Sequence, residues 1–313
     1  MKNTVKKIAG FAMAFTLLGT GTVVTKTISP ESDNTIVASA ITSIGTGSQI
    51  GQISNKNGGI QGMGMYNNVF YFVTQKNNSN CKLYRMNMNG NTSEISLSKS
   101  DSQLIGHGND LCVAKCNGKL CLFVVDGQNN KNILLKYELN SAQTKATLAA
   151  KYQLDKNVSA VTLVNPDGNN NLKFIFRNER NIFTAEIGRN ESSGKKKTTN
   201  SGNIQLERGA AVSQGICYYK DLLIVPYTDS NYKYNYIQVY RMKSNLKIDG
   251  YLLDSFKIGK NSKFEIESID YSNGNNWYYN TNENGYCRLY LNTSLGNAIN
   301  RIVEARYYEM SRR

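Results

Sequence analysis

The chain has 313 residues and a formal net charge of +14, with 37 Lys and Arg against 23 Asp and Glu. A surface with this excess of positive charge is attracted to polyanions. The single histidine and the lack of any Cys-x-x-Cys pair argue against a zinc cluster, and we expect neither a metal nor a cofactor.

Residues 1–40 have the features of an export signal. A segment with three lysines precedes an apolar stretch from Ile8 to Val24, and Ala38–Ala40 fits the small-residue rule for peptidase cleavage. A membrane helix is the alternative, but Gly19–Thr22 interrupts the stretch, which is also short for a span of about 20 apolar residues. We expect a secreted, extracellular protein that begins near Ile41 and keeps no transmembrane segment.

Loss of residues 1–40 removes four lysines and two acidic residues, so the net charge falls from +14 to +12. Polyanions outside a cell include teichoic acids, anionic lipid headgroups and acidic polysaccharides. We do not expect nucleic acid as a partner, because an exported protein does not routinely meet it. Most positive charges are scattered, and the run Lys195–Lys197 falls in a polar segment, residues 189–203, that we expect to be a mobile loop.

From residue 61 onward one pattern occurs five times: a small or polar residue, an alternating apolar strand, a Gly/Asn turn and a second apolar strand. In chain order the strands of the first two repeats are predicted at 62–66, 69–75, 81–88 and 93–97, then 111–116, 120–126, 132–139 and 147–154. Those of the other three are predicted at 160–165, 172–178, 181–188 and 203–208, then 214–219, 222–228, 236–242 and 250–256, then 267–272, 276–281 and 287–292.

The repeat period predicts the fold. The residues that begin each repeat are about 50 positions apart, which for strands is typical of a β-propeller; they are Gln61, Asn109, Ser159, Gln214 and Glu267. We expect an all-β protein with one propeller domain over residues 41–313, built from five four-stranded blades. A sixth blade built from both termini is the alternative.

The fifth repeat lacks a fourth strand, and propellers usually close by adding a strand from one terminus to the last blade. The candidates are Ser48–Ser54 and Arg301–Met310. Closure removes the sheet edges that would otherwise be exposed. We expect no amphipathic helix anywhere in the chain.

The chain has six cysteines, an even number that permits disulfides in a secreted protein without requiring them. A hairpin turn at Asn117–Gly118 would place Cys121 opposite Ala114, so that these two residues share a sheet face with Cys112 and Cys116. We interpret the thiols as small core residues. The Asx-rich turns after Asp126 and Asp167 lack the acidic pattern of a calcium loop.

Several polar residues lie where an innermost strand is predicted to begin. Because innermost strands line the channel of a propeller, these side chains should converge on one mouth and form a ligand site; they are Gln61, His107, Asn109, Asp110, Gln214, Glu265 and Glu267. The alternative is a polar network that fills the channel. Gly62 and Gly215 should allow close approach of the backbone near the axis.

The same cluster contains carboxylates that could be catalytic. Paired carboxylates serve glycoside hydrolysis, and Asp110, Glu265 and Glu267 are the candidates. Glu265 and Glu267 share a sheet face, and repulsion between them would raise one pKa. His107 could exchange protons near neutral pH. Because no motif fixes a reaction, we favour binding over catalysis.

Three short sequence motifs resemble those of the helveticin J group of secreted bacteriocins and bacteriocin-like β-propellers. They are His107–Asp110, Ser213–Ile216, and Phe264–Ile269 followed by a Trp/Tyr strand and Arg288–Tyr290, in the order that the family has. The resemblance covers roughly Gly59 to Leu291. The chain differs from the family at Asn109, where the family has an acidic residue, and in the third repeat. It implies a secreted propeller that acts at bacterial envelopes, and no catalytic residue is carried over from it.

The function predicted from the sequence is a secreted, monomeric binding propeller whose axial pocket holds a glycan or an anionic cell-wall polymer. One alternative is a helveticin J-like bacteriocin with antibacterial activity. The other is a carboxylate-dependent glycan hydrolase or lyase.

Overall fold

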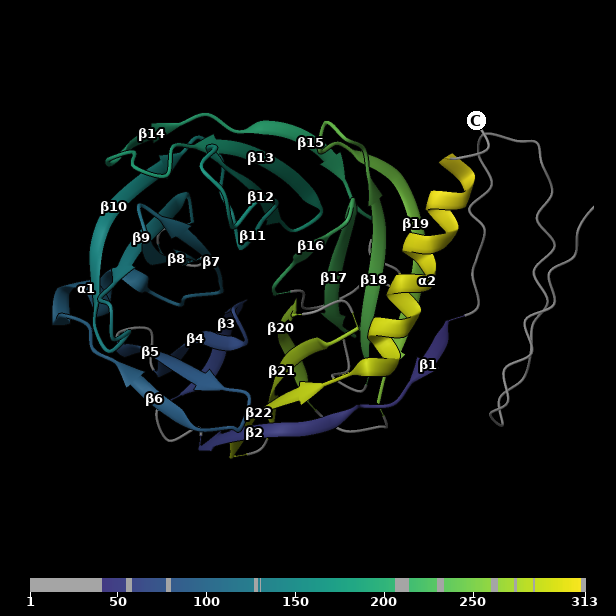
Figure 1. Cartoon of the computed structure of the whole chain (residues 1–313), viewed down its shortest axis with the longest axis horizontal. Helices are drawn as coiled ribbons and strands as arrows, with labels where there is room; N and C mark the ends of the chain where they lie inside the picture. The colour runs from purple at the N-terminus through teal and green to yellow at the C-terminus, as the bar shows by residue number, and fades with distance from the viewer. Residues whose placement is uncertain are drawn as a thin grey trace, which may run out of the picture. The chain divides into compact units, whose positions relative to one another are not determined.

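Five small sheets are arranged around one axis as a five-bladed β-propeller (Figure 1). The computed structural model describes residues 41–54, 58–76, 80–126, 129, 131–205, 214–229, 234–259, 264–272, 275–283 and 285–310. The propeller belongs to the unit formed by residues 41–313, and the predicted export signal at residues 1–40 lies outside the described residues. No helix in the described part is long and apolar enough to cross a membrane.

Blades 1 and 2 each contain four strands that pair in chain order, with the first strand innermost. Their bounds lie close to the predicted strands: β3 Gly59–Tyr66, β4 Val69–Lys76, β5 Asn80–Asn87 and β6 Thr92–Ile95 in blade 1, and β7 Asp110–Cys116, β8 Lys119–Val125, β9 Ile133–Leu139 and β10 Ala146–Leu154 in blade 2. The period-2 alternation of Val, Ile, Leu and aromatic residues predicted these strands because a half-buried sheet requires it.

Blades 3 and 4 repeat the arrangement, with β11 Ala160–Leu163, β12 Leu172–Asn178, β13 Asn181–Ile187 and β15 Thr199–Asn203 in blade 3, and β16 Cys217–Tyr219, β17 Leu222–Thr228, β18 Asn235–Met242 and β19 Ile248–Ile258 in blade 4. Two short strands add parallel edges, β1 Thr42–Ile44 on β19 and β14 Gly194–Lys196 on β10. The blades are therefore four-stranded, as predicted, and two of them carry a short fifth strand.

Blade 5 is closed by the N-terminal strand. It contains β20 Glu265–Tyr271, β21 Trp277–Glu283 and β22 Tyr286–Leu291, and its outer strand is β2 Ser48–Ser54, which pairs antiparallel with β22. One of the two predicted closing segments is thus confirmed with its predicted bounds. The described residues form five blades, so the six-bladed alternative was wrong.

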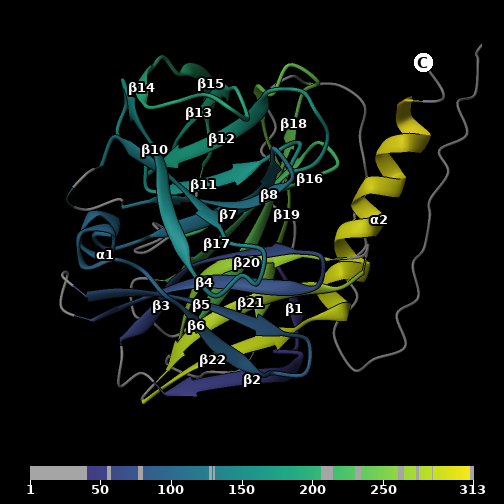
Figure 2. The same cartoon turned by 60° about the vertical axis from the view of Figure 1, so that its left-hand side comes forward.

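The other predicted closing segment is helical, and the expectation of no helix was wrong. Helix α2, Thr293–Met310, packs on blades 4 and 5 (Figures 1 and 2), where Asn300 Oδ1 accepts a hydrogen bond from the Tyr219 hydroxyl and Arg306 donates to the Asp221 backbone oxygen. Leu295, Ile299 and Val303 recur every fourth residue, so they share one helix face and pack into the core cluster of blades 4 and 5. This spacing overrode the β propensity of the Tyr and Val residues in the segment.

A second helix, α1 Lys99–Ile105, joins blades 1 and 2. It begins at Ser98, whose side chain accepts a hydrogen bond from the Asp101 backbone N–H, and it ends at Gly106, where φ is 63°. A serine cap and a glycine stop are the expected signals of a short helix.

The segment expected to be a mobile loop is ordered. Its first residue, Arg189, is buried, and β14 and β15 both lie within residues 189–203. The fourth strand of blade 3 is β15, four residues upstream of the predicted start at residue 203, and residues 206–208 of that prediction lie outside the described residues. The polar composition misled the prediction because β15 lies at the blade's outer edge.

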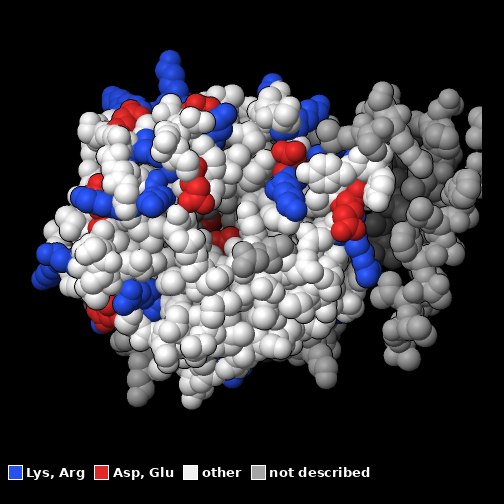
Figure 3. Space-filling model, in the orientation of Figure 1, with Lys and Arg blue, Asp and Glu red and all other residues white. Residues whose placement is uncertain are grey.

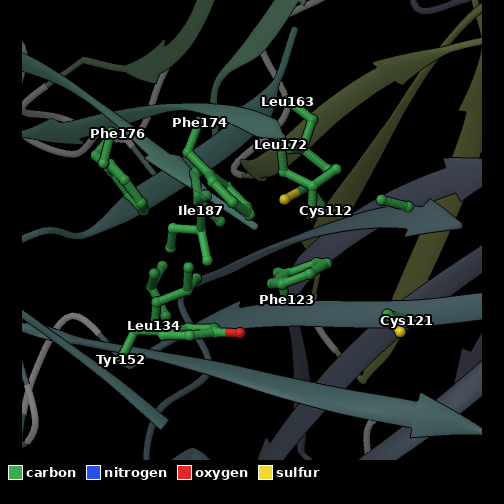
Figure 4. Close-up of a cluster of buried hydrophobic side chains, with 14 of the residues drawn as sticks. Cys112, Cys121, Phe123, Leu134, Tyr152, Leu163, Leu172, Phe174, Phe176 and Ile187 are labelled. Atoms are coloured by element: carbon green, nitrogen blue, oxygen red, sulfur yellow. The ribbon is translucent and has the colours of Figure 1, made fainter. Parts of the chain in front are cut away.

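Apolar side chains between neighbouring blades form the core. Between blades 2 and 3, Phe123 and Phe174 meet edge to face, with ring centroids 5.0 Å apart (Figure 4). The predicted pairing of Cys121 with Ala114 is confirmed, and Cys112 and Cys116 lie in the same buried cluster. All six cysteines are buried as free thiols.

Candidate functional site

The innermost strands β3, β7, β11, β16 and β20 surround the axis and run in the same direction along it, as equivalent strands of a propeller do. The end where they begin is called the N-terminal mouth, and the end where they finish the C-terminal mouth. The backbones approach closely: a Cβ added to Gly62 would lie 2.5 Å from the Asp110 Cα, and one added to Gly215 would lie 3.0 Å from the Ser268 Cα. Only glycine fits at Gly62, as the sequence predicted.

At the N-terminal mouth, four predicted site residues from three blades form one hydrogen-bonded chain. His107 Nδ1 lies 2.9 Å from Asn109 Oδ1, Asn109 Nδ2 donates to Gln214 Oε1 at 3.1 Å, and Gln214 Nε2 donates to Glu265 Oε1 at 3.4 Å. Since the Asn109 amide nitrogen already donates to Gln214, its oxygen accepts, and His107 Nδ1 carries the proton. His107, Gln214 and Glu265 are only partly buried, so ligands can reach this chain from solvent.

Glu267 lies deeper than Glu265 and is 2 % exposed. Its Oε1 accepts a hydrogen bond from Asn282 Nδ2 at 2.5 Å, whereas its buried Oε2 has no hydrogen-bond partner within the part of the chain that the structure describes. Asn282 also bonds both backbone groups of Ile60, which fixes the amide between blades 5 and 1. Gln61, the next residue, is likewise buried. A buried carboxyl oxygen without a partner costs free energy unless a ligand or water satisfies it.

Burial shifts the pKa values of the ionisable groups in this cluster. Burial, followed by the charge of Glu265, raises the pKa of Glu267 well above its usual range. Burial also raises the pKa of Glu265, although the hydrogen bond from Gln214 opposes this. Burial lowers the pKa of His107, so its imidazole favours the neutral form. The amides of Asn109 and Gln214 and the neutral imidazole both donate and accept, which suits the hydroxyl groups of a polar ligand.

Asp110 has a different environment from the other predicted residues. Its carboxylate accepts hydrogen bonds from the backbone N–H groups of Leu111 at 3.0 Å, Val161 at 2.9 Å and Ile216 at 3.3 Å. It is 1 % exposed, and burial raises its pKa to about 8. Because its oxygens already bond the backbones of blades 2, 3 and 4, Asp110 holds the inner strands together and is not open to a ligand.

Three further residues support this cluster. Ser268 donates to Asp110, Asn282 binds Glu267, and Arg177 donates to the backbone oxygens of Gln214 and Glu179 at 2.5 and 3.0 Å. Ser268 belongs to the polar run at residues 265–268 that the sequence already indicated, whereas the other two residues were missed. Arg177 and Asn282 lie on second strands of their blades, and no local pattern marks them.

The charges are unevenly distributed over the face in Figure 3. Lys and Arg side chains gather over blades 2, 3 and 4, whereas the part formed by blades 1 and 5 carries few of them. A hollow near the middle of this face has acidic side chains at its floor.

Comparisons with known proteins identify the fold. No family model matches the chain, and no curated protein matches it. Among solved structures, the native arabinanase Arb43A of Bacillus subtilis is similar with a TM-score of 0.50 and 13% identity, over 80% of this chain and 99% of that one. A GH43 endo-arabinanase of Bacillus licheniformis has a TM-score of 0.46 and 13% identity, over 81% and 96% of the two chains.

An engineered GH43 glycoside hydrolase with endo-xylanase and exo-arabinofuranosidase activity has a TM-score of 0.48 and 8% identity, over 77% of this chain. The present chain spans about half of that protein, 51% of its length. At these identities the similarity to the B. subtilis arabinanase shows the propeller fold alone.

Proposed function

We propose that this chain is a secreted propeller that binds a glycan or cell-wall polymer at bacterial envelopes through its N-terminal mouth. The observation that carries the proposal is Glu267, whose buried Oε2 has no partner among the described residues and lies next to the hydrogen-bonded chain of His107, Asn109, Gln214 and Glu265. A ligand hydroxyl that reached Glu267 would satisfy this oxygen.

The chemistry of the mouth favours an uncharged, hydroxyl-rich ligand. The amides of Asn109 and Gln214 donate and accept at once, as sugar hydroxyls do. The guanidinium of Arg177 lies behind the mouth and donates to backbone oxygens, so it is not placed to recognise an anion. The similar fold of an arabinanase provides a precedent for a glycan-directed propeller.

The positive charge on the outer surface of the propeller would attract the protein to the anionic bacterial envelope. The net charge of +12 expected after export would draw the protein to teichoic acids, and this attraction would weaken as salt screens it. The resemblance to helveticin J is in keeping with action at bacterial envelopes. Antibacterial activity is the corresponding alternative, and loss of viability in related strains treated with micromolar purified protein would support it.

Binding to purified cell walls, with and without their teichoic acids, tests the proposal. We expect Gln214→Ala and Glu267→Ala to weaken binding to walls stripped of teichoic acid at least about tenfold, since each removes a hydrogen-bonding partner worth about 1.4 kcal/mol or more. Gln153→Ala is the matched control, because Gln153 is exposed on β10, an outer strand of blade 2. Equal binding by all three variants and the parent would refute the role of the mouth.

Hydrolysis is the second candidate, favoured by the raised pKa of two neighbouring carboxyls, Glu265 and Glu267. A carboxyl whose pKa is raised can act as a general acid. Release of reducing ends from arabinan, xylan and peptidoglycan would reveal such an activity. It should then fall by about 10²-fold or more in Glu265→Gln and Glu267→Gln. If none of the three polymers yields product, binding remains the function.

A further inference from the structure

The C-terminal mouth contains a cavity of about 260 Å³ on the far side of the Asp110 contacts. Its wall includes the last residues of innermost strands, such as Met65, Thr162, Tyr218 and Asp270. Asp270 is held in place because its Oδ2 accepts a hydrogen bond from the Met65 backbone at 2.7 Å and its Oδ1 accepts one from the Tyr271 backbone at 2.8 Å. No residue of the predicted ligand site lines this cavity.

A larger cavity of about 660 Å³ lies between blades 1 and 2. It is formed by the β3–β4 turn, the β7–β8 turn and the end of β9. Tyr66 and Asn67 line both cavities, so the two spaces adjoin. The two neighbouring cavities are together called here the Tyr66 groove.

Two of the four tyrosines that line this groove, Tyr66 and Tyr71, are held by hydrogen bonds to other blades. The Tyr66 hydroxyl donates to Asp167 Oδ1 at 2.6 Å, which ties blade 1 to a turn of blade 3. The Tyr71 hydroxyl donates to Gln143 Oε1 at 2.7 Å, which ties blade 1 to blade 2. Rings fixed in this way bind a ligand at little cost in conformational entropy.

The turn that carries Asp167 is itself fixed by Arg189. The buried guanidinium donates to the backbone oxygens of Asn165, Pro166, Asp167, Asn170 and Lys115. The wall beside Tyr66 is therefore preorganised although it is built from a loop.

The polar groups of the groove match a neutral, hydroxyl-rich chain. Exposed amides and hydroxyls line it, including Asn67, Asn140, Ser141 and Thr147. Lys119 forms an ion pair with Glu138 at 2.8 Å. The other charged lining residues are Lys115, Asp167 and Asp270; Asp167 accepts a hydrogen bond from Tyr66, and Asp270 accepts two from the backbone. Tyr66 is partly exposed, and an amphipathic tyrosine suits the mixed polar and apolar surface of a sugar ring.

We infer that the Tyr66 groove is a second ligand site that binds an extended neutral oligosaccharide, separate from the N-terminal mouth. Two adjoining cavities need a ligand long enough to occupy both. Affinity should therefore rise with chain length from a disaccharide to a hexasaccharide, because each added sugar gains contacts along a fixed wall.

Isothermal titration of the purified full-length chain with cellohexaose, xylohexaose and chitohexaose, and with their disaccharides, tests this inference. We expect at least one hexasaccharide to bind at least tenfold more tightly than its disaccharide. Tyr66→Ala and Asn67→Gly should each weaken that binding at least tenfold. Asn67 has φ of 49°, so glycine keeps the turn while removing the side chain.

Tyr308→Ala is the matched control, because Tyr308 is 73% exposed on α2, away from the groove. Thermal melts separate loss of binding from loss of folding, and Asn67→Gly should melt as the parent does. Hexasaccharide binding that is lost in Gln214→Ala but kept in Tyr66→Ala and Asn67→Gly would place this ligand at the N-terminal mouth and overturn the inference. The inference is overturned if no hexasaccharide binds, if Asn67→Gly binds normally, or if hexagalacturonic acid or a peptide is the only ligand found.

Discussion

The Asp110 carboxylate and the Ser268 hydroxyl, 158 positions apart in the chain, are joined by a hydrogen bond of 3.3 Å at the axis of the propeller. Asp110 also bonds backbone groups of blades 2, 3 and 4, while the Ser268 hydroxyl in blade 5 accepts from Met63 N and donates to Gln61 O in blade 1. This pair therefore contacts all five blades. A propeller without covalent closure gains from such a central contact because each blade otherwise packs only on its neighbours.

Removal of this central contact should destabilise the fold. Asp110→Ala leaves three buried N–H groups without an acceptor, at about 1 kcal/mol or more each, so we expect a loss of about 3 kcal/mol or more. Ser268→Ala should cost about 1–3 kcal/mol. Urea unfolding measures both, and the exposed Ser141→Ala is the control, with a change under about 0.5 kcal/mol. An Asp110→Ala variant as stable as the parent would contradict the structural role assigned to this residue.

Stability should fall as the pH rises from 5 to 8. Burial raises the pKa of Asp110 to about 8 and that of Asp270 to about 6, so both groups bind more protons when folded than when unfolded. Stability from such groups is fully present below the unfolded pKa, near 4, and is lost as the pH rises through the folded pKa. The chain has one histidine, so few other side chains change charge in this window.

The loss from Asp110 alone could reach about 4 kcal/mol over three pH units. Urea unfolding at pH 5, 6.5 and 8 measures it. Glu267→Gln should flatten the dependence, because burial also raises the pKa of Glu267. Glu304→Gln, at an exposed position on α2, should not. Stability that increases between pH 5 and 8 would contradict the assignment.

The turn of residues 165–170 should depend on Arg189. Arg189→Met keeps much of the buried stem but leaves backbone oxygens without their donor, and we expect a loss of about 2–4 kcal/mol. Arg180→Met, at an exposed position between β12 and β13, is the matched control. Hydrogen exchange should also rise in this turn. Unchanged exchange and stability would show that the turn is held by other contacts.

Strand β2 should be required for closure of the propeller. Deletion of residues 41–54 removes both β1 and β2 and exposes the edge of β22, which we expect to lower the melting temperature and promote aggregation. The smaller deletion of residues 41–45, which removes β1 alone, separates the two strands. If the longer deletion melted at the temperature of the shorter one, β2 would not be the closing strand.

Local strand structure and the number of blades could be predicted because they depend on short-range patterns. Alternating apolar residues specify which strand face is buried, and turns such as Asn117–Gly118, where φ is 48° and 76°, fix the hairpin register. Even the closing strand was among two candidates. The other candidate strand, in the C-terminal segment, was wrong. Leu295, Ile299 and Val303 recur with a helical period there, but the β-branched and aromatic residues of the segment favoured a strand prediction.

The site was predictable only in part. The polar residues at strand starts could be found because a propeller places all its innermost strands at one axis. The sequence could not distinguish Asp110 from Glu267. The Asp110 carboxylate accepts hydrogen bonds from the backbones of other blades, whereas a buried oxygen of Glu267 has no partner among the described residues. That difference depends on contacts such as Met63 with Ser268, 205 positions apart, and Asn282 with Ile60, 222 positions apart. The sequence by itself determined the strands and their repeat. Only the tertiary structure decided which polar groups are satisfied, because their partners come from other blades.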